Sequence, residues 1–290
     1  MTLPKPPSTP SDAAVQPDPA SARPLAIAIA GAGGRMGRQL LELVAADAGS
    51  HLLAAWVGPQ SSRLGQPVPG TALAYSALPE ASTGKHDTGD TARPDVVVDF
   101  SHAGAFDQVL AWCWRERVAL VSGTTGLDAS QHQALADAGA DIPVLWSANF
   151  SLGVAVLSRL VAQAARLLPD WQAEIVEAHH AGKRDAPSGT ALALGMRLAQ
   201  ARGGTLDELA VFDRSRDDQP RRPEQIGFAV VRAGDIVGEH SVLLAGAGER
   251  LELVHRAGDR SIFARGALHA ARFLAGQVPG RYAFEDVLAG

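Results

Sequence analysis

The sequence has little cysteine, no excess of positive charge and no long hydrophobic run. Cys113 is its one cysteine among 290 residues, which excludes an internal disulfide framework and a cysteine-based zinc site. The net charge of −5 gives no basic footprint for a nucleic acid or an anionic membrane. The most apolar window, 144–162, contains Asn149 and Arg159, which argues against a membrane span. We therefore expect a cytoplasmic protein with no metal site and no nucleic-acid or membrane partner.

The first 24 residues are rich in proline, serine and alanine, and they lack the apolar core of a signal peptide. We interpret 1–24 as a disordered leader, because it cannot bury enough surface to offset the entropy of ordering. The chain is longer than a usual single domain. We predict a dinucleotide-binding domain from 25–150 with 261–290, and a substrate-binding and oligomerisation domain from 151–260.

An apolar run at 25–30 leads into a glycine-rich turn and then into a helical pattern. Gly31, Gly34 and Gly37 are spaced as G-x-x-G-x-x-G, because Met36 stands where G-x-G-x-x-G would place its third glycine. Such a turn brings the backbone close to a pyrophosphate and directs a helix N-terminus at it. A strand before it and a helix after it favour dinucleotide binding over a glycine turn without a ligand.

The carboxylate that often binds the adenosine ribose is missing. Dinucleotide-binding folds frequently place an acidic residue about 20 residues beyond the glycines, where the second strand ends. Here the expected strand at 51–57 runs into Gly58, Pro59 and Gln60. Arg63 follows and could meet a 2′-phosphate. NADPH or NADH is therefore the expected cofactor, with a slight preference for NADPH.

Three more buried strands are expected at 95–100, 118–121 and 142–146, and each ends in small polar residues. Ser101 is expected to cap the helix that follows the first of them, and a short strand is expected at 73–75. Strands that alternate with helices predict a Rossmann-like, doubly wound parallel sheet of the α/β class. Such sheets bind ligands at the carboxyl ends of their strands.

After residue 151 the pattern changes. A helix at 154–168, an alternating strand at 172–178 and a helix at 188–202 are followed by three strands, at 226–232, 236–245 and 250–255. We expect these three to be antiparallel, with turns at 233–235 and 246–248. This half predicts a second, α+β domain built on an open mixed sheet. A last helix at 261–274 is expected to return to the first domain.

The densest group of reactive side chains lies in EAHHAGKRDAPSGTALAL, residues 177–194. His179 and His180 could supply a proton near neutral pH, and Lys183 could neutralise a negative charge. The following Ser188 is a typical helix-start residue. Helix-start amides without intrahelical partners, here those of Ser188, Gly189 and Thr190, bind a carboxylate or a phosphate. We interpret the stretch as an active site rather than a solvated loop.

These motifs resemble one known family. The motif E-A-H-H-x-x-K-x-D-A-P-S-G-T-A at 177–191 is similar to that of the 4-hydroxy-tetrahydrodipicolinate reductases, also called dihydrodipicolinate reductases. The segments GAGGRMGR, DF[ST], SGTTG and SANFSLGV match in order and spacing. The resemblance covers nearly everything from residue 25 onward.

The resemblance implies reduction of a dicarboxylate heterocycle in the diaminopimelate route to lysine, with hydride added at C4 and a proton at C3. It implies that His179 donates the proton, that Lys183 acts in catalysis, and that the family's usual homotetramer forms through the second domain. The implied substrate contacts are His180, Lys183, Ser188, Gly189 and Thr190. The implied cofactor contacts are Gly31, Gly34, Arg35, Met36, Gly37, Gly123, Thr124, Thr125, Ser147, Ala148, Asn149 and Phe150.

The chain departs from the family pattern in two places. Ala181 and Gly182 stand where some relatives carry Arg and His, which implies fewer cationic contacts to the substrate. Gly58 replaces the acidic residue that many relatives place after the second strand. Two alternatives stay open at this point. One is another two-domain nicotinamide dehydrogenase, and the other is a non-catalytic redox sensor that binds a dinucleotide.

Overall fold

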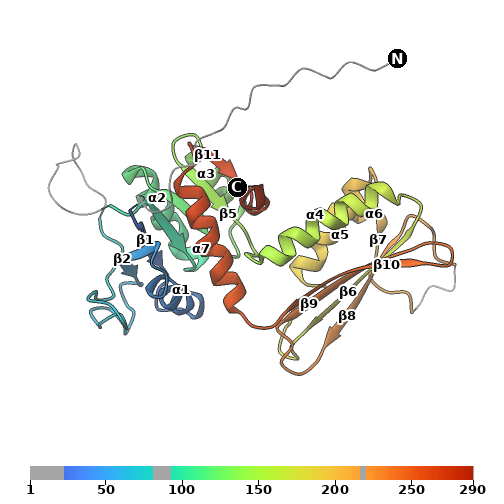
Figure 1. Ribbon diagram of the computed structural model, residues 1–290, viewed down its shortest axis with the longest axis horizontal. Coiled ribbons are helices and arrows are strands. Elements are labelled where there is room, and N and C mark those ends of the chain that lie inside the picture. Colours follow the sequence, from blue (N-terminus) through green and yellow to red (C-terminus); the bar gives the residue numbers. More distant parts are fainter. Residues whose placement is uncertain (1–22, 81–92, 216–219, 290) are drawn as a thin grey trace, which may run out of the picture.

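Six parallel strands form the first sheet of the computed structural model, which describes residues 23–80, 93–215 and 220–289 (Figure 1). The strand order is β11-β5-β4-β3-β1-β2, so the direction in which strands are added reverses next to β1. The strands are β1 (Leu25–Ala30), β2 (Ser50–Trp56), β3 (Val96–Asp99), β4 (Ala119–Ser122), β5 (Pro143–Trp146) and β11 (Gly280–Tyr282). A ligand is expected at such a reversal, beyond the carboxyl ends of the strands.

Helices cover both faces of this sheet, as predicted for a doubly wound fold. One face packs against α1 (Arg35–Ala45) and α7 (Ser261–Ala275), and the other against α2 (Ala103–Glu116) and α3 (Ala129–Ala138). Alternate residues of β1 serve the two faces, since Ile27 and Ile29 belong to one apolar cluster and Ala28 and Ala30 to the other. Cys113 is fully buried in the α2 layer.

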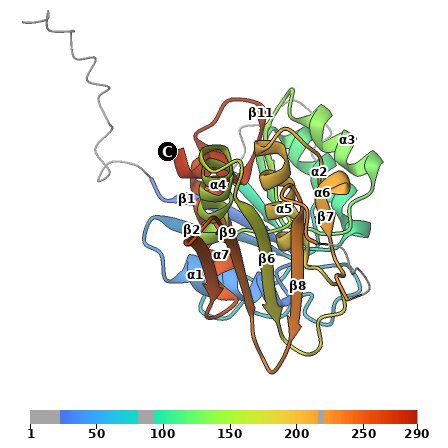
Figure 2. The ribbon, with the colours of Figure 1, turned by 90° about the vertical axis from the view of Figure 1, so that its right-hand side faces the viewer.

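The second sheet is mixed and has the order β10-β9-β6-β8-β7. Its strands are β6 (Gln172–His179), β7 (Ala210–Val211), β8 (Ile226–Arg232), β9 (Gly238–Ala245) and β10 (Arg250–Ala257). The helices α4 (Leu152–Leu167) and α5 (Gly189–Ala201) pack against one face, and the short α6 (Leu206–Leu209) follows α5. Figure 2 shows β8, β6 and β9 side by side. The predicted open mixed sheet is confirmed.

The expected pairing of the strands at 226–232 and 236–245 is wrong. β6 lies between β8 and β9, pairing with β8 in parallel and with β9 antiparallel. The turn at 233–235 therefore carries the chain past the end of β6 rather than closing a hairpin. An alternating pattern shows which face of a strand is buried, but it does not identify the neighbouring strand.

Two local predictions differ from the structure, and two short elements were missed. Ser101 does not cap α2, because the N-cap is His102 and the Ser101 hydroxyl is buried with no partner among the described residues. The expected strand at 73–75 is reduced to isolated bridges, Pro67 with Ala74 and Trp56 with Ser76. The strand β11 and the 3₁₀ helix η1 (Phe284–Ala289) were not predicted.

The predicted leader lies outside the described residues, apart from Arg23 and Pro24. Arg23 donates two hydrogen bonds to the carboxylate of Asp95, at the start of the β3 segment. Over the described ranges, none of the helices has the length and apolar character needed to cross a bilayer.

Candidate active site

The glycine loop connects β1 to α1 with its backbone packed against neighbouring backbone. Gly31 has a φ of +73°, and a Cβ there would lie 2.5 Å from the carbonyl oxygen of Phe100. A Cβ on Gly37 would lie 2.3 Å from the carbonyl oxygen of Gly31. Gly34 is the N-cap of α1, and within the described chain the amides of Arg35, Met36 and Gly37 have no backbone acceptor. This helix start has the form that binds a pyrophosphate.

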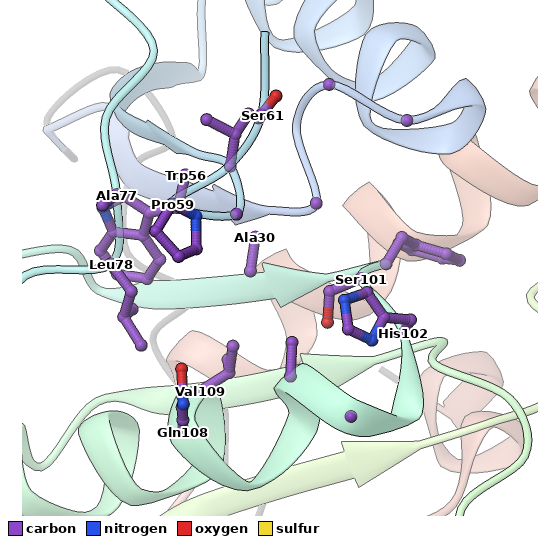
Figure 3. A pocket seen from close by; sticks show the side chains of 18 residues that line it. Ala30, Trp56, Pro59, Ser61, Ala77, Leu78, Ser101, His102, Gln108 and Val109 are labelled. Carbon is purple, nitrogen blue, oxygen red and sulfur yellow. The ribbon is translucent and has the colours of Figure 1, made fainter. Parts of the chain in front are cut away.

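A pocket of about 560 Å³, here called the glycine-loop pocket, opens beside this loop. Figure 3 shows Trp56 and Pro59 on one side and Gln108 and Val109 of α2 on the other. None of the described residues that line the pocket carries a carboxylate, and a Cβ on Gly58 would meet nothing within 4 Å. Just outside, the aliphatic part of Arg63 lies against Gly33, and its guanidinium stacks 5.9 Å from the ring centre of Tyr75.

A buried carboxylate holds the ends of β3 and β4 together. Asp99 accepts hydrogen bonds from the hydroxyls of Ser122 and Thr124, at 2.9 and 2.8 Å. Thr124 is buried, so its hydroxyl serves this network rather than a pocket. Gly123 packs against the ring of Phe100. These two predicted cofactor contacts lie at the carboxyl end of β4, but they line neither the glycine-loop pocket nor the pocket around His179.

A second pocket, of about 600 Å³ and here called the histidine pocket, lies between the loop that follows β5 and the start of α5. It brings together predicted cofactor contacts of the first half and predicted catalytic and substrate-binding residues of the second: Thr125, Ser147, Ala148, Asn149, His179, Lys183, Ser188, Gly189 and Thr190. The amide nitrogen of Asn149 donates to the hydroxyl of Thr190 at 3.0 Å, which joins the two groups directly. Phe150 is buried instead, in edge contact with Phe284.

His179 is hydrogen-bonded to Glu177, which forms an ion pair with Arg232. Its Nδ1 lies 2.6 Å from Glu177, which is 1% exposed and also binds the guanidinium of Arg232 through both oxygens at 2.8 Å. Burial raises the pKa of Glu177, but hydrogen bonds from Arg232, His179 and the amide of Ser188 outweigh burial, so this pKa lies below its ordinary value. The ionised carboxylate can only accept, so Nδ1 of His179 carries a hydrogen and Nε2 remains for chemistry.

The start of α5 is tied to the same group. Ser188 is the N-cap, and its hydroxyl accepts from the amide of Ala191 at 3.2 Å and lies 3.0 Å from Nε2 of His240. The Ser188 amide, predicted to be free for an anion, donates to Glu177 at 2.9 Å. Within the described chain the amides of Gly189 and Thr190 have no acceptor, so two donors of the predicted anion site remain.

Of the other two predicted substrate contacts, Lys183 lines the histidine pocket and His180 does not. Lys183 lines the histidine pocket and forms an ion pair with Asp185 at 2.8 Å, which lowers the pKa of that carboxyl. Asp185 is 62% exposed, and such surface pairs are weak, so Lys183 can exchange this partner for a ligand carboxylate. His180 does not line the pocket, and its Nε2 lies 3.5 Å from Arg260 at the start of α7.

Sequence reasoning missed the residues that support the pocket from outside the motif. Arg232 comes from β8 and His240 from β9, far along the chain from His179. One signal was present, because alternate residues of a strand share a face and Glu177 therefore lies beside His179. A carboxylate on the buried face of a strand requires a cation nearby, although the sequence does not say which arginine supplies it.

The doubly wound sheet, the mixed sheet and the site between them define a nicotinamide-dependent oxidoreductase. Residues 25–150 match the family model described as dihydrodipicolinate reductase, N-terminus, and residues 153–288 match the model of its C-terminus. The chain therefore belongs to the dihydrodipicolinate reductase family.

Curated relatives agree with this assignment. The chain is 47% identical over 266 residues to the 4-hydroxy-tetrahydrodipicolinate reductase of Xanthomonas campestris pv. campestris (strain B100), covering 91% of this chain and 98% of the relative. It is 45% identical over 263 residues to the enzyme of the same name from Thiobacillus denitrificans, covering 90% and 97%. The predicted family and enzyme class are confirmed, and the alternative of a redox sensor without activity is set aside.

A solved structure shows the same fold. It is a dipicolinate-bound dihydrodipicolinate reductase from Paenisporosarcina sp. TG-14, which matches with a TM-score of 0.73 at 21% identity and covers 91% of this chain and 99% of that one. At this identity the likeness supports the fold alone.

Proposed function

We propose that this protein reduces 4-hydroxy-tetrahydrodipicolinate, through its dehydrated form, to tetrahydrodipicolinate with NADPH or NADH, in the diaminopimelate route to lysine. The observation that carries the proposal is the histidine pocket. There Asn149, at the edge of the first sheet, is bonded to Thr190 of the helix start that faces His179 and Lys183. The residues proposed to bind the coenzyme and those proposed to donate the proton and bind the anion therefore line the same cavity.

The chain's residues fit a dinucleotide along the edge of the first sheet. The free amides of Arg35, Met36 and Gly37 suit the pyrophosphate, and the open space at Gly58 leaves room for the adenosine half. Thr125 and Ser147 to Asn149, which line the histidine pocket, would hold the nicotinamide end, with Gly123, Thr124 and Phe150 shaping that edge from behind. When bound, the coenzyme supplies the hydride that is added at C4.

The substrate side of the pocket matches a dicarboxylate. The amides of Gly189 and Thr190 point out of the N-terminus of α5, where the helix dipole favours an anion. A Cβ on Gly189 would meet nothing within 4 Å, so a carboxylate can approach the backbone there. Lys183 supplies a cation for the second carboxylate, and His179 donates the proton to C3. His180, beside Arg260, would contact the substrate from the rim.

NADPH is the coenzyme that we propose is preferred. Among the described residues that line the glycine-loop pocket, no carboxylate is available to bind a ribose diol or to repel a 2′-phosphate. Arg63 stands against Gly33 at the rim, where its guanidinium can reach a phosphate.

The outer face of the second sheet is the proposed subunit interface of a cytoplasmic homotetramer. Val231 and Val254 lie on the face turned away from α4 and α5 and are 43% and 40% exposed. An open sheet with apolar residues on its uncovered face favours packing against another copy. This interface would belong to the proposed substrate-binding and oligomerisation domain, 151–260. The dinucleotide-binding domain would then consist of 25–150 and 261–290.

The test is the rate of coenzyme oxidation, followed by absorbance, with substrate generated enzymatically. Turnover with both coenzymes, and a lower KM for NADPH, is the expected result. Arg63→Leu should raise the KM for NADPH about tenfold and leave that for NADH unchanged, since it removes a charge-assisted contact to phosphate alone. Absence of turnover with either coenzyme, despite dinucleotide binding, would refute the proposed reaction.

A further inference from the structure

Two histidines on neighbouring strands, His240 buried and His255 partly buried, each contact the capping serine of a helix. Nε2 of His240 lies 3.0 Å from the hydroxyl of Ser188, which caps α5. Nε2 of His255 lies 3.2 Å from the hydroxyl of Ser151, which caps α4. His240 and His255 stand opposite each other in the β9–β10 register. In both rings Nδ1 is buried and has no partner among the described residues.

The unpartnered Nδ1 identifies the tautomer of His240. A buried N–H without an acceptor is costlier and rarer than a buried lone pair without a donor. The hydrogen of a neutral His240 therefore belongs on Nε2, where the Ser188 oxygen accepts it. The ring stays neutral, because burial first and the nearby His179 second lower the pKa of His240 to about 4.

In this arrangement the Ser188 hydroxyl can form one further hydrogen bond, as a donor. A hydroxyl oxygen has two lone pairs, and those of Ser188 accept from the amide of Ala191 and from Nε2 of His240. Only its hydrogen is then left, and Ser188 lines the histidine pocket. The Ser151 hydroxyl has the same two kinds of donor, the Val154 amide and His255, but Ser151 does not line that pocket.

We propose that His240 is a positioning residue that fills the last acceptor site of the Ser188 hydroxyl and thereby commits its hydrogen to a carboxylate in the histidine pocket. The proposal rests on the proposed function, because that function supplies the dicarboxylate. His240 also packs edge-on against His179, with ring centres 5.2 Å apart, and it is not one of the residues that line the histidine pocket.

The test compares two amide replacements of His240 that differ in reach. His240→Gln can place an N–H donor near the position of Nε2, whereas His240→Asn ends near the position of Nδ1 and cannot reach Ser188. We expect His240→Asn to raise the substrate KM about tenfold, the effect of losing one hydrogen bond to a charged group, with the coenzyme KM unchanged. His240→Gln should restore most of the loss.

Two further variants separate positioning from packing. In a Ser188→Ala background, His240→Asn should raise the substrate KM by less than twofold more, because its effect passes through the missing hydroxyl. His255→Asn disrupts the matched contact to Ser151 and should leave the substrate KM unchanged while lowering the melting temperature. Melting curves of all variants show which are folded.

An unchanged substrate KM in folded His240→Asn would overturn the inference, and so would equal losses in the Gln and Asn variants or independent effects in the double variant. Failure of the proposed function is distinguishable, because the unsubstituted protein would then show no turnover at all.

Discussion

The two pockets keep their shape by different means. The glycine-loop pocket is built from closely packed backbone, and the amides beside it that have no backbone acceptor in the described chain belong to one helix start. The histidine pocket is built from side chains that hold one another, with Glu177 joined to His179, to Arg232 and to the amide of Ser188. The first pocket should therefore be sensitive to added volume, and the second to the loss of a charge or a hydrogen-bond donor.

Removing the proton donor should have the largest effect. His179→Ala leaves the coenzyme-binding edge intact but takes away the acid of the histidine pocket. We expect kcat to fall by about 100- to 10,000-fold, the usual contribution of general acid catalysis. The dissociation constant of NADPH, measured by fluorescence titration, should be unchanged. An equal loss in kcat and in coenzyme affinity would contradict the division of labour between the two pockets.

Neutralising Glu177 should be the most damaging change to stability. Glu177→Gln leaves the guanidinium of Arg232, 19% exposed, without its carboxylate, and it replaces by an NH2 group one of the two oxygens that accept from His179 and from the amide of Ser188. Breaking such a buried pair costs about 3–5 kcal/mol of unfolding free energy, measurable by urea denaturation.

A matched exposed pair provides the control for this change. Asp141→Asn removes the carboxylate that pairs with Arg117, where the two side chains are 40% and 55% exposed. Its cost should stay within about 1 kcal/mol. Similar losses in the two variants would mean that burial of the Glu177 pair is not what matters.

Acid should lower the free energy of unfolding, and His240 should be the first group to contribute. The pKa of His240 is lowered from 6.5 to about 4, mainly by burial, so below pH 6.5 the unfolded chain takes up a proton that the folded chain refuses. Stability should fall from pH 6.5 down to about pH 4 by up to about 3 kcal/mol and then level off for this group. The pKa of Glu177 lies below 4.5 in the folded protein. Below pH 4.5 the unfolded chain therefore binds a proton at Glu177 more readily than the folded chain does, which adds to the decline.

His240→Gln tests that assignment, since it removes the titrating ring. Denaturation between pH 7 and pH 4 should show a shallower dependence in this variant. The contribution of His255, whose pKa burial also lowers, should remain. An identical pH dependence in both proteins would rule out His240 as the source.

Added volume at the glycine loop should have the smallest effect of the four. Gly37→Ala places a Cβ 2.3 Å from the Gly31 carbonyl oxygen, so helix and loop must move apart. Overpacking of this kind costs about 1–3 kcal/mol, and NADPH affinity should weaken with it. Gly49→Ala, whose Cβ would meet only the Asp47 side chain at 3.5 Å, is the control. Equal coenzyme affinity in the two variants would show that the loop tolerates the shift.

The same contrast explains how much the sequence revealed. The parallel sheet and the glycine loop were predictable, because each strand, turn and helix start is encoded within a few adjacent residues. The motif at 177–191 also predicted a helix that begins after Ser188, and the structure has it there. It did not show that β6 separates β8 from β9, and so it could not place Arg232 and His240 on either side of Glu177. Contacts between distant segments depend on strand order, which local patterns do not specify.

The position of Glu177 has a consequence for protein engineering. The motif 177–191 is continuous in the chain, yet its buried carboxylate is neutralised by Arg232 from another strand. A graft of this segment alone onto a foreign scaffold would carry an uncompensated charge into the recipient's core and would lack the histidine that contacts Ser188. The smallest transplantable unit is therefore the three-stranded group β8-β6-β9 with α5, and not the motif by which the family is recognised.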